Sequence, residues 1–226
     1  MNEPSGPRIF HALPPVIIAL AVIIGGIEGL FWLGEVGLLP GGAEWRTEAV
    51  RNWGFFGELA RRMIETGDWR ADILRRFVSY PLIHQSMTHA LFAIVFVLAI
   101  GNMVAHVFRP WAVLAIFFAS SVVGALVYGL VLDERFPLIG GYPGVYGLIG
   151  AYTFLLWVNL TATGGPRHQA FILIGMLLGI QLAFSLIFDA RNDWVADIAG
   201  FAAGFAMSFV VSPGGGARVI ARLRRR

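Results

Sequence analysis

The chain contains no cysteine and no lysine, and only 14% of its 226 residues are charged. Without cysteine, the chain has no disulfides, thiolate metal sites or thiol nucleophiles. A soluble globular domain carries about 25% charged residues, so the scarcity of charge points to a solvent other than water. Hydrophobic residues make up 57% of the chain. They gather in runs of about 20, the length of helix that crosses a hydrocarbon core. We therefore predict an all-α, polytopic membrane protein.

Six apolar runs predict a bundle of six spans, with no internal repeat and no second domain. The predicted spans are 13–33, the part of 77–107 that follows its polar start, 110–132, 141–160, 168–187 and 194–211. The membrane domain is accordingly placed at 13–211. It is flanked by an N-terminal segment, 1–12, and a basic tail, 212–226.

The long connection 34–76 carries apolar residues at helical spacing. These are Trp53, Phe56, Leu59, Ala60, Met63 and Ile64, with Glu58, Arg61, Arg62 and Glu65 on the opposite face. This pattern favours an amphipathic helix lying in the membrane interface over a helix that crosses the membrane.

Arginine in the short loops predicts the orientation of the chain. One side holds Arg8, Arg109, Arg167 and five tail arginines, whereas the other side holds Arg135 and Arg191. We therefore expect both termini in the cytoplasm and the long connection outside. The basic tail follows a span directly, which favours contact with anionic lipid headgroups over nucleic acid. All 17 basic residues are arginine, which is typical of a GC-rich bacterial genome. We expect the chain in the bacterial inner membrane.

Ionisable side chains within spans are expensive, at about 2.5–3.5 kcal/mol for a central aspartate. The candidates are Glu28, His84, His89 and Asp197, joined by Tyr142. Each has an ordinary explanation, in which Glu28 reaches headgroup water, His84 lies at the interface and Asp197 caps the last span. Their occurrence at several span ends on the same side favours a shared polar pocket.

Small residues predict which spans lie closest together. Gly144 and Gly147 lie near the start of the fourth span, and Gly200-x-x-x-Gly204 lies in the sixth. Because small residues four apart let helix backbones approach closely in lipid, spans four and six are the expected close pair.

Four stretches of the sequence carry a resemblance to a known family. They are Arg76 with Ser79-Tyr80-Pro81-Leu82-Ile83-His84; His84-x4-His89 running to Ile100-Gly101-Asn102; Gly140-Gly141-Tyr142-Pro143-Gly144-Val145-Tyr146-Gly147-Leu148-Ile149-Gly150; and Asp193-x3-Asp197-x2-Gly200-x3-Gly204. Over about 75–204, together with the amphipathic connection, the chain resembles the rhomboid intramembrane serine proteases in their six-span bacterial form. The resemblance implies a six-span helical bundle. It also places Arg76 in the first-loop motif and His84 among the site positions.

The resemblance further implies where catalytic residues would lie. In active members, a serine in a Gly-x-Ser-Gly turn opens the fourth span, and a histidine of the sixth span is its base. A histidine and an asparagine of the second span help to hold the oxyanion. Here Tyr142 occupies the serine position and Pro143 the following glycine, although deletion of one residue would place Pro143 on the serine. Asp197 replaces the base and Ala93 the asparagine, whereas His89 is retained.

Loss of the nucleophile, the base and one oxyanion donor predicts a chain without serine hydrolase activity. We expect Tyr142 to hydrogen-bond Asp197, which would replace the catalytic pair with a structural link. The predicted function is that of a pseudoprotease that binds transmembrane segments of client proteins within the lipid bilayer, without a cofactor or metal. One alternative is an intramembrane serine-type endopeptidase with unusual site residues. Another is a transporter or channel, which the missing inverted repeats disfavour.

Overall fold

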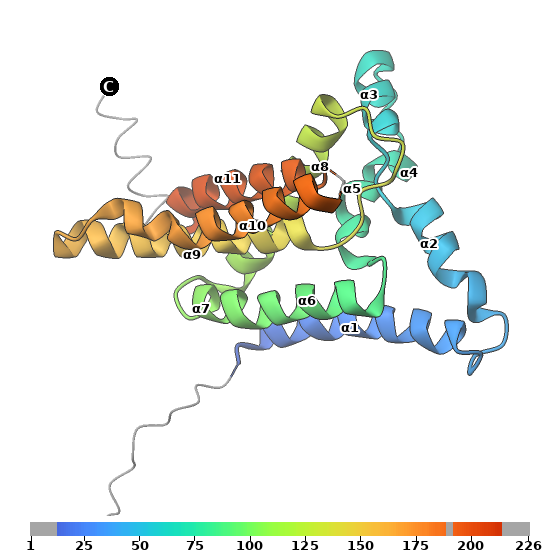
Figure 1. Cartoon of the computed structure of the whole chain (residues 1–226), viewed down its shortest axis with the longest axis horizontal. Helices are drawn as coiled ribbons and strands as arrows, with labels where there is room; N and C mark the ends of the chain where they lie inside the picture. Colours follow the sequence, from blue (N-terminus) through green and yellow to red (C-terminus); the bar gives the residue numbers. More distant parts are fainter. Residues whose placement is uncertain (1–12, 189–191, 214–226) are drawn as a thin grey trace, which may run out of the picture.

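The computed structural model describes residues 13–188 and 192–213. The predictions for segment 1–12, for Arg191 and for the arginine-rich tail fall outside the described residues. Long helices form the body of the described chain, as Figure 1 shows. The all-helical fold predicted from the apolar runs is confirmed.

The long helices follow the apolar runs closely. They are α1 (Pro15–Glu35), α6 (Met87–Phe96) with its continuation through the π-helical Val97–Gly101 into α7 (Asn102–Ala105), α8 (Pro110–Val131), α9 (Tyr142–Thr163), α10 (Ile172–Phe188) and α11 (Trp194–Val211). In the described part of the chain, five helices are long and apolar enough to cross a membrane, with α6 to α7 counted as one. The remaining predicted span, α10, has 17 residues, so it is shorter than these five and stays a prediction.

The second span begins later than its apolar run suggested. Residues before it form the short helices α5 (Arg76–Ser79) and η2 (Tyr80–Leu82) and then a loop. The helix α6 begins after Ser86, because the Ser86 side chain accepts a hydrogen bond from the backbone N–H of His89. A serine at this position satisfies one of the amides that a helix start leaves without a partner.

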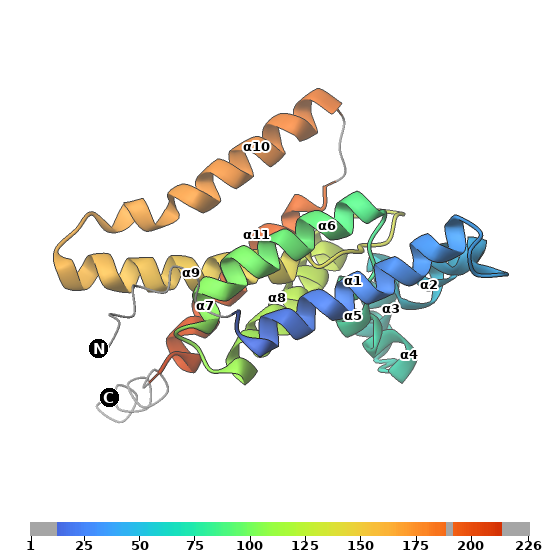
Figure 2. The same ribbon diagram turned by 90° about the horizontal axis from the view of Figure 1, so that it is seen from below.

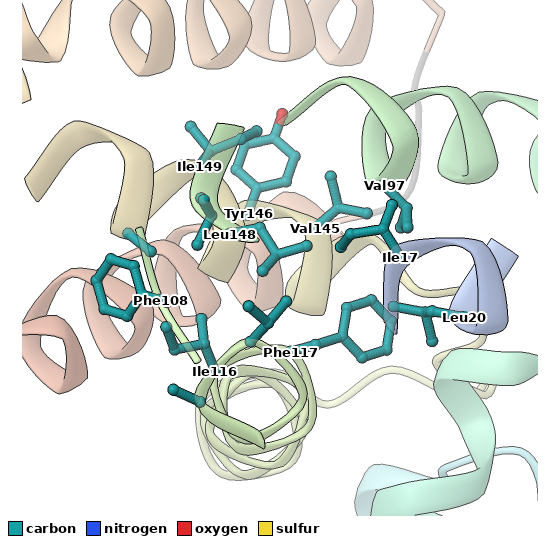
Figure 3. Close-up of a cluster of buried hydrophobic side chains, with 14 of the residues drawn as sticks. Ile17, Leu20, Val97, Phe108, Ile116, Phe117, Val145, Tyr146, Leu148 and Ile149 are labelled. Carbon is teal, nitrogen blue, oxygen red and sulfur yellow. The ribbon is translucent and has the colours of Figure 1, made fainter. Parts of the chain in front are cut away.

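The core lies where α8, α9 and α11 meet α1 and α6. Figure 3 shows Phe117 of α8 and Val145 of α9 pointing toward Ile17 and Leu20 of α1. The helices α9 and α11 are in backbone contact. A Cβ added at Gly200 would lie only 2.9 Å from the carbonyl carbon of Pro143. The close pairing expected for these two spans is therefore present in the fold.

The amphipathic helix predicted in the connection between α1 and α6 is present as α3 (Gly57–Thr66), although it begins four residues after Trp53, the first residue of the pattern. The connection also contains η1 (Gly42–Glu44), α2 (Trp45–Trp53) and α4 (Ala71–Leu74), followed by the short helices α5 and η2. The break between α2 and α3 exists because Phe55 forms two backbone hydrogen bonds with Leu138, at 3.1 and 2.8 Å. In Figure 1, α2 to α5 lie together alongside the C-terminal half of α1.

The apolar face of α3 packs on α8. Ala60 and Met63 are fully buried, and a Cβ added at Gly57 would lie 3.0 Å from the Cα of Gly129. Arg61 donates a hydrogen bond to the Leu132 carbonyl, 2.9 Å away, and pairs with Asp133 at 2.6 Å. Protein therefore covers much of the face that the pattern had assigned to the membrane interface. The depth of α3 in the membrane stays a prediction.

Candidate functional site

The candidate site lies at the start of α9, where two glycines hold the backbone against α6. Gly140 has a φ of +98°, a conformation that favours glycine, and its N–H donates to the Tyr80 carbonyl at 3.1 Å. A Cβ at Gly140 would lie 2.7 Å from Cε1 of His89. The Gly141 N–H donates to Nε2 of His84 at 3.2 Å. Two long-range hydrogen bonds thus fix the turn that opens the helix.

His84 is buried, with 1% of its surface exposed, and its expected depth at the membrane interface stays a prediction. Burial, followed by the charges of His89 and Arg46, lowers the pKa of the His84 imidazole to about 3. The ring is therefore neutral near pH 7, and this leaves Nε2 free to accept the hydrogen bond from Gly141. His84 acts as a support for the start of α9.

Tyr142 makes its contacts with α6. Its hydroxyl donates to the His89 carbonyl at 3.2 Å, and its ring stacks on the His89 imidazole with centroids 4.8 Å apart and planes 14° apart. The expected hydrogen bond between Tyr142 and Asp197 is absent from the described residues, and that prediction is wrong.

Asp197 finds its partner on α10. Its Oδ2 accepts a hydrogen bond from Nε2 of Gln181 at 2.8 Å, and only 3% of the residue is exposed. The capping explanation for Asp197 is wrong, since α11 begins at Trp194 and its first residues carry no side-chain cap. Asp197 instead lies inside the first turns of α11, facing the site.

These side chains enclose a polar pocket of about 150 Å³. Its lining consists of His89, Leu138, Ile139, Tyr142, Pro143, Gln181, Asp193 and Asp197. The lining residues include no serine, threonine or cysteine. Four of the predicted site residues, His89, Tyr142, Pro143 and Asp197, are thus brought together. Among the described residues, no group of three or more His, Cys, Asp or Glu side chains is arranged to hold a metal ion.

The other predicted residues lie around this pocket or away from it. Ala93 is fully buried on α6 and does not line the pocket. Gly144, Gly147, Gly200 and Gly204 form close contacts of α9 with α8 and α11. Arg76 lies in the connection, where its Nη1 donates to the carbonyls of Arg51 and Gly54 at 2.9 and 2.8 Å.

Glu28 is a separate case, and its expected contact with headgroup water is wrong. The carboxylate is buried, with 1% exposed, and pairs with Arg46 of α2 at 2.7 Å. The same guanidinium donates from Nη1 to the carbonyl of His84 at 2.7 Å. Arg46 therefore ties α1 to the residue that supports the start of α9.

A protein-family model for the rhomboid domain matches residues 71–214, which is more than half of the chain. The chain belongs to the rhomboid family. The matched region runs from α4 to the end of α11 and contains every pocket residue, whereas α1 and most of the connection precede it. No curated protein matches this rhomboid significantly. The family resemblance predicted from the four sequence stretches is confirmed, and the chain is an integral membrane protein.

Two polar residues of the rhomboid pocket were missed by sequence reasoning. Gln181 lies in the middle of an apolar run, and an uncharged polar side chain at that depth signals a partner on a neighbouring helix. Asp193 lies one turn before Asp197, so the spacing alone places both carboxylates on one face of α11. Arg46 was also missed, although a carboxylate buried in a span requires a cation nearby.

Proposed function

We propose that this rhomboid is proteolytically inactive and binds transmembrane segments of other membrane proteins. The stacking of Tyr142 on His89 is the observation that supports the lack of proteolytic activity. His89 belongs to the oxyanion set in the family pattern, and to serve as a base for this phenol it would have to point a ring nitrogen at the hydroxyl. Here the two rings lie nearly parallel, and the hydroxyl donates to a backbone carbonyl. The phenol therefore lacks the arrangement that activates a nucleophile.

The remaining family positions support the same conclusion. Asp197 stands in place of the base, and Gln181 already donates to one of its oxygens. Pro143 has no N–H in the first turn of α9, and Ala93 offers a methyl group in place of an amide. Fixed donors on an oxyanion are worth about 3–4 kcal/mol each in acyl transfer, so their loss is severe for hydrolysis.

The position of α10 supports binding of a client helix. Figure 2 shows α10 at the edge of the bundle, diverging from α9 and α11. Gln181 of α10 donates a hydrogen bond to Asp197 of α11 at 2.8 Å. Ile172, Met176 and Ile180 of α10 are 62%, 56% and 49% exposed. An apolar helix that diverges from the bundle and exposes one face can separate from its neighbours and admit another span.

Proteolysis is tested on the purified chain in detergent, with a fluorophosphonate probe and a transmembrane reporter substrate. We expect neither labelling nor cleavage. Labelling or cleavage that disappears in Tyr142→Phe would establish an active peptidase and overturn the proposal.

Client binding is tested by photocrosslinking in the native membrane from Met176 of α10. Val22 of α1 is the control position, because it is 64% exposed on a helix far from α10. We expect a discrete set of membrane proteins, trapped through their spans, from position 176 but not from position 22. Identical products from both positions would mean random neighbours, and would contradict client binding.

A further inference from the structure

A second recess of about 380 Å³ opens on the outside of the bundle, between α1, α2 and the segment 79–83. It is lined by Ile27, Leu30, Phe31, Ala49, Trp53, Ser79, Leu82 and Ile83. The lining side chains carry two polar groups, the indole N–H of Trp53 and the hydroxyl of Ser79, and the hydroxyl already donates to the Trp53 carbonyl at 2.8 Å. The recess therefore offers a mainly apolar surface, which suits a hydrocarbon ligand.

The recess lies at the end of a membrane span. Leu30 and Phe31 belong to the C-terminal part of α1, and the chain leaves the helix after Glu35. Leu30 and Trp53 are 53% and 42% exposed on its walls. Tryptophan is typical of the level at which hydrocarbon meets headgroups, so the recess opens where both parts of a phospholipid are at hand.

Arginines without a carboxylate partner stand beside the recess. The Arg75 guanidinium lies 4.3 Å from the centre of the Trp53 ring. Among the described residues, neither Arg75 nor Arg76 has a carboxylate within 4.0 Å. Burial, followed by the neighbouring Arg75 charge, lowers the pKa of Arg76, and the Asp72 carboxylate offsets only part of this effect. An anion at this edge would compensate two adjacent like charges.

From this recess and the neighbouring Arg75 we propose a lipid site. An acyl chain of an anionic phospholipid fills the recess, and the phosphate of the same lipid binds Arg75. A helix about 10 Å wide fills roughly 420 Å³ per turn, so the recess would hold less than one turn of a partner span. A flexible hydrocarbon chain fits this volume. The site is separate from the polar pocket and does not rest on the proposed pseudoprotease function.

Native mass spectrometry of the full chain in detergent tests the site, with phosphatidylglycerol and phosphatidylcholine of identical acyl chains as the probes. We expect one phosphatidylglycerol to be retained about fivefold more tightly than phosphatidylcholine, the value for about 1 kcal/mol per arginine. Arg75→Gln should reduce phosphatidylglycerol binding to the level of phosphatidylcholine. Ala49→Trp, which places an indole in the groove, should remove the retained lipid of either kind.

Two matched variants separate the site from general lipid contact. Arg62→Gln removes an exposed arginine of α3, and Val22→Trp adds an indole to an exposed face of α1. Both should bind phosphatidylglycerol as the wild type does. Equal loss in Arg62→Gln and Arg75→Gln would show a diffuse charge effect and overturn the proposal. Retention of the lipid by a folded Ala49→Trp variant would also overturn the proposal. If Ala49→Trp does not fold, the comparison of Arg75→Gln with Arg62→Gln tests the site.

Discussion

The Arg46 guanidinium donates to both carboxylate oxygens of Glu28, from Nη1 at 3.0 Å and from Nη2 at 2.7 Å. It also donates from Nε to Glu35 at 2.5 Å. Burial lowers the pKa of Arg46, but the hydrogen bonds to Glu28 and Glu35 outweigh this and raise it above its ordinary value. The cation therefore remains charged and fastens the connection to α1.

Breaking this pair should destabilise the fold strongly. Arg46→Gln leaves the Glu28 carboxylate buried without a cation, and the loss of one partner of a buried pair costs about 3–5 kcal/mol. The free energy of unfolding, measured by SDS titration in mixed micelles, should fall by this amount. Arg62→Gln, at an exposed arginine, is the control and should change it by less than about 0.5 kcal/mol. Equal stability of the two variants would contradict a structural role for the pair.

The buried His84 should make stability depend on pH. Its pKa is about 3 in the fold and 6.5 ordinarily, so between these values the unfolded chain binds a proton that the folded chain does not. Stability is therefore greatest above pH 6.5 and is lost as the pH falls, by at most about 1.4 kcal/mol per unit. In unfolding titrations at pH 7.5 and 5, His84→Gln should lose less stability than the wild type, because glutamine accepts the Gly141 hydrogen bond without titrating. The same loss in both proteins would exclude His84 as the source.

The contact of α9 with α11 should reject even a methyl group. In Gly204→Ala the new Cβ would meet the Gly147 backbone, with its carbonyl carbon 2.5 Å away. Overpacking of this kind costs about 1–3 kcal/mol. Gly179→Ala in α10 is the matched control, since an added Cβ there meets no atom within 4 Å in the described structure. In thermal unfolding in detergent, the midpoint temperature of Gly204→Ala should be lower than that of the wild type, whereas the midpoint of Gly179→Ala should be unchanged.

Asp197 should behave as a hydrogen-bond acceptor rather than as a charge. Asn in its place retains a carbonyl oxygen for Gln181, whereas Ala leaves the buried amide of Gln181 without that partner, at about 1–3 kcal/mol. The free energy of unfolding of Asp197→Asn should therefore lie within about 0.5 kcal/mol of the wild-type value. Asp197→Ala should unfold at a clearly lower mole fraction of SDS. Gln181→Leu combined with Asp197→Ala should recover part of the loss. Equal damage from Asn and Ala would indicate that the negative charge itself is needed.

Apolar runs were enough to predict the long helices, because a helix in lipid must be both long and apolar. The sixth span, Trp194–Val211, was placed with the bounds that the structure shows. The connection was harder to predict. Its helix breaks at Phe55 because of a backbone pairing with Leu138, and local periodicity carries no information about a partner so distant in the chain.

The sequence predicted which residues line the site but not which hydrogen bonds and ring contacts they form. Glycine spacing and the family resemblance placed His89, Tyr142, Pro143 and Asp197 near one another, and these four line one pocket. Sequence positions do not fix where a side chain points. The phenol therefore stacks on α6 while the carboxylate takes its hydrogen bond from α10.

The hydrogen bond from Arg61 to Leu132 joins residues 71 positions apart. At about 5–20 residues per second, α3 leaves the ribosome roughly 4–14 s before the end of α8 exists to receive it. During that interval Ala60 and Met63, fully covered in the finished fold, have only the bilayer surface to shelter them. The amphipathic pattern of α3 thus meets a requirement of nascent-chain insertion, and a charge at position 63 would act by delaying assembly as well as by weakening the completed protein.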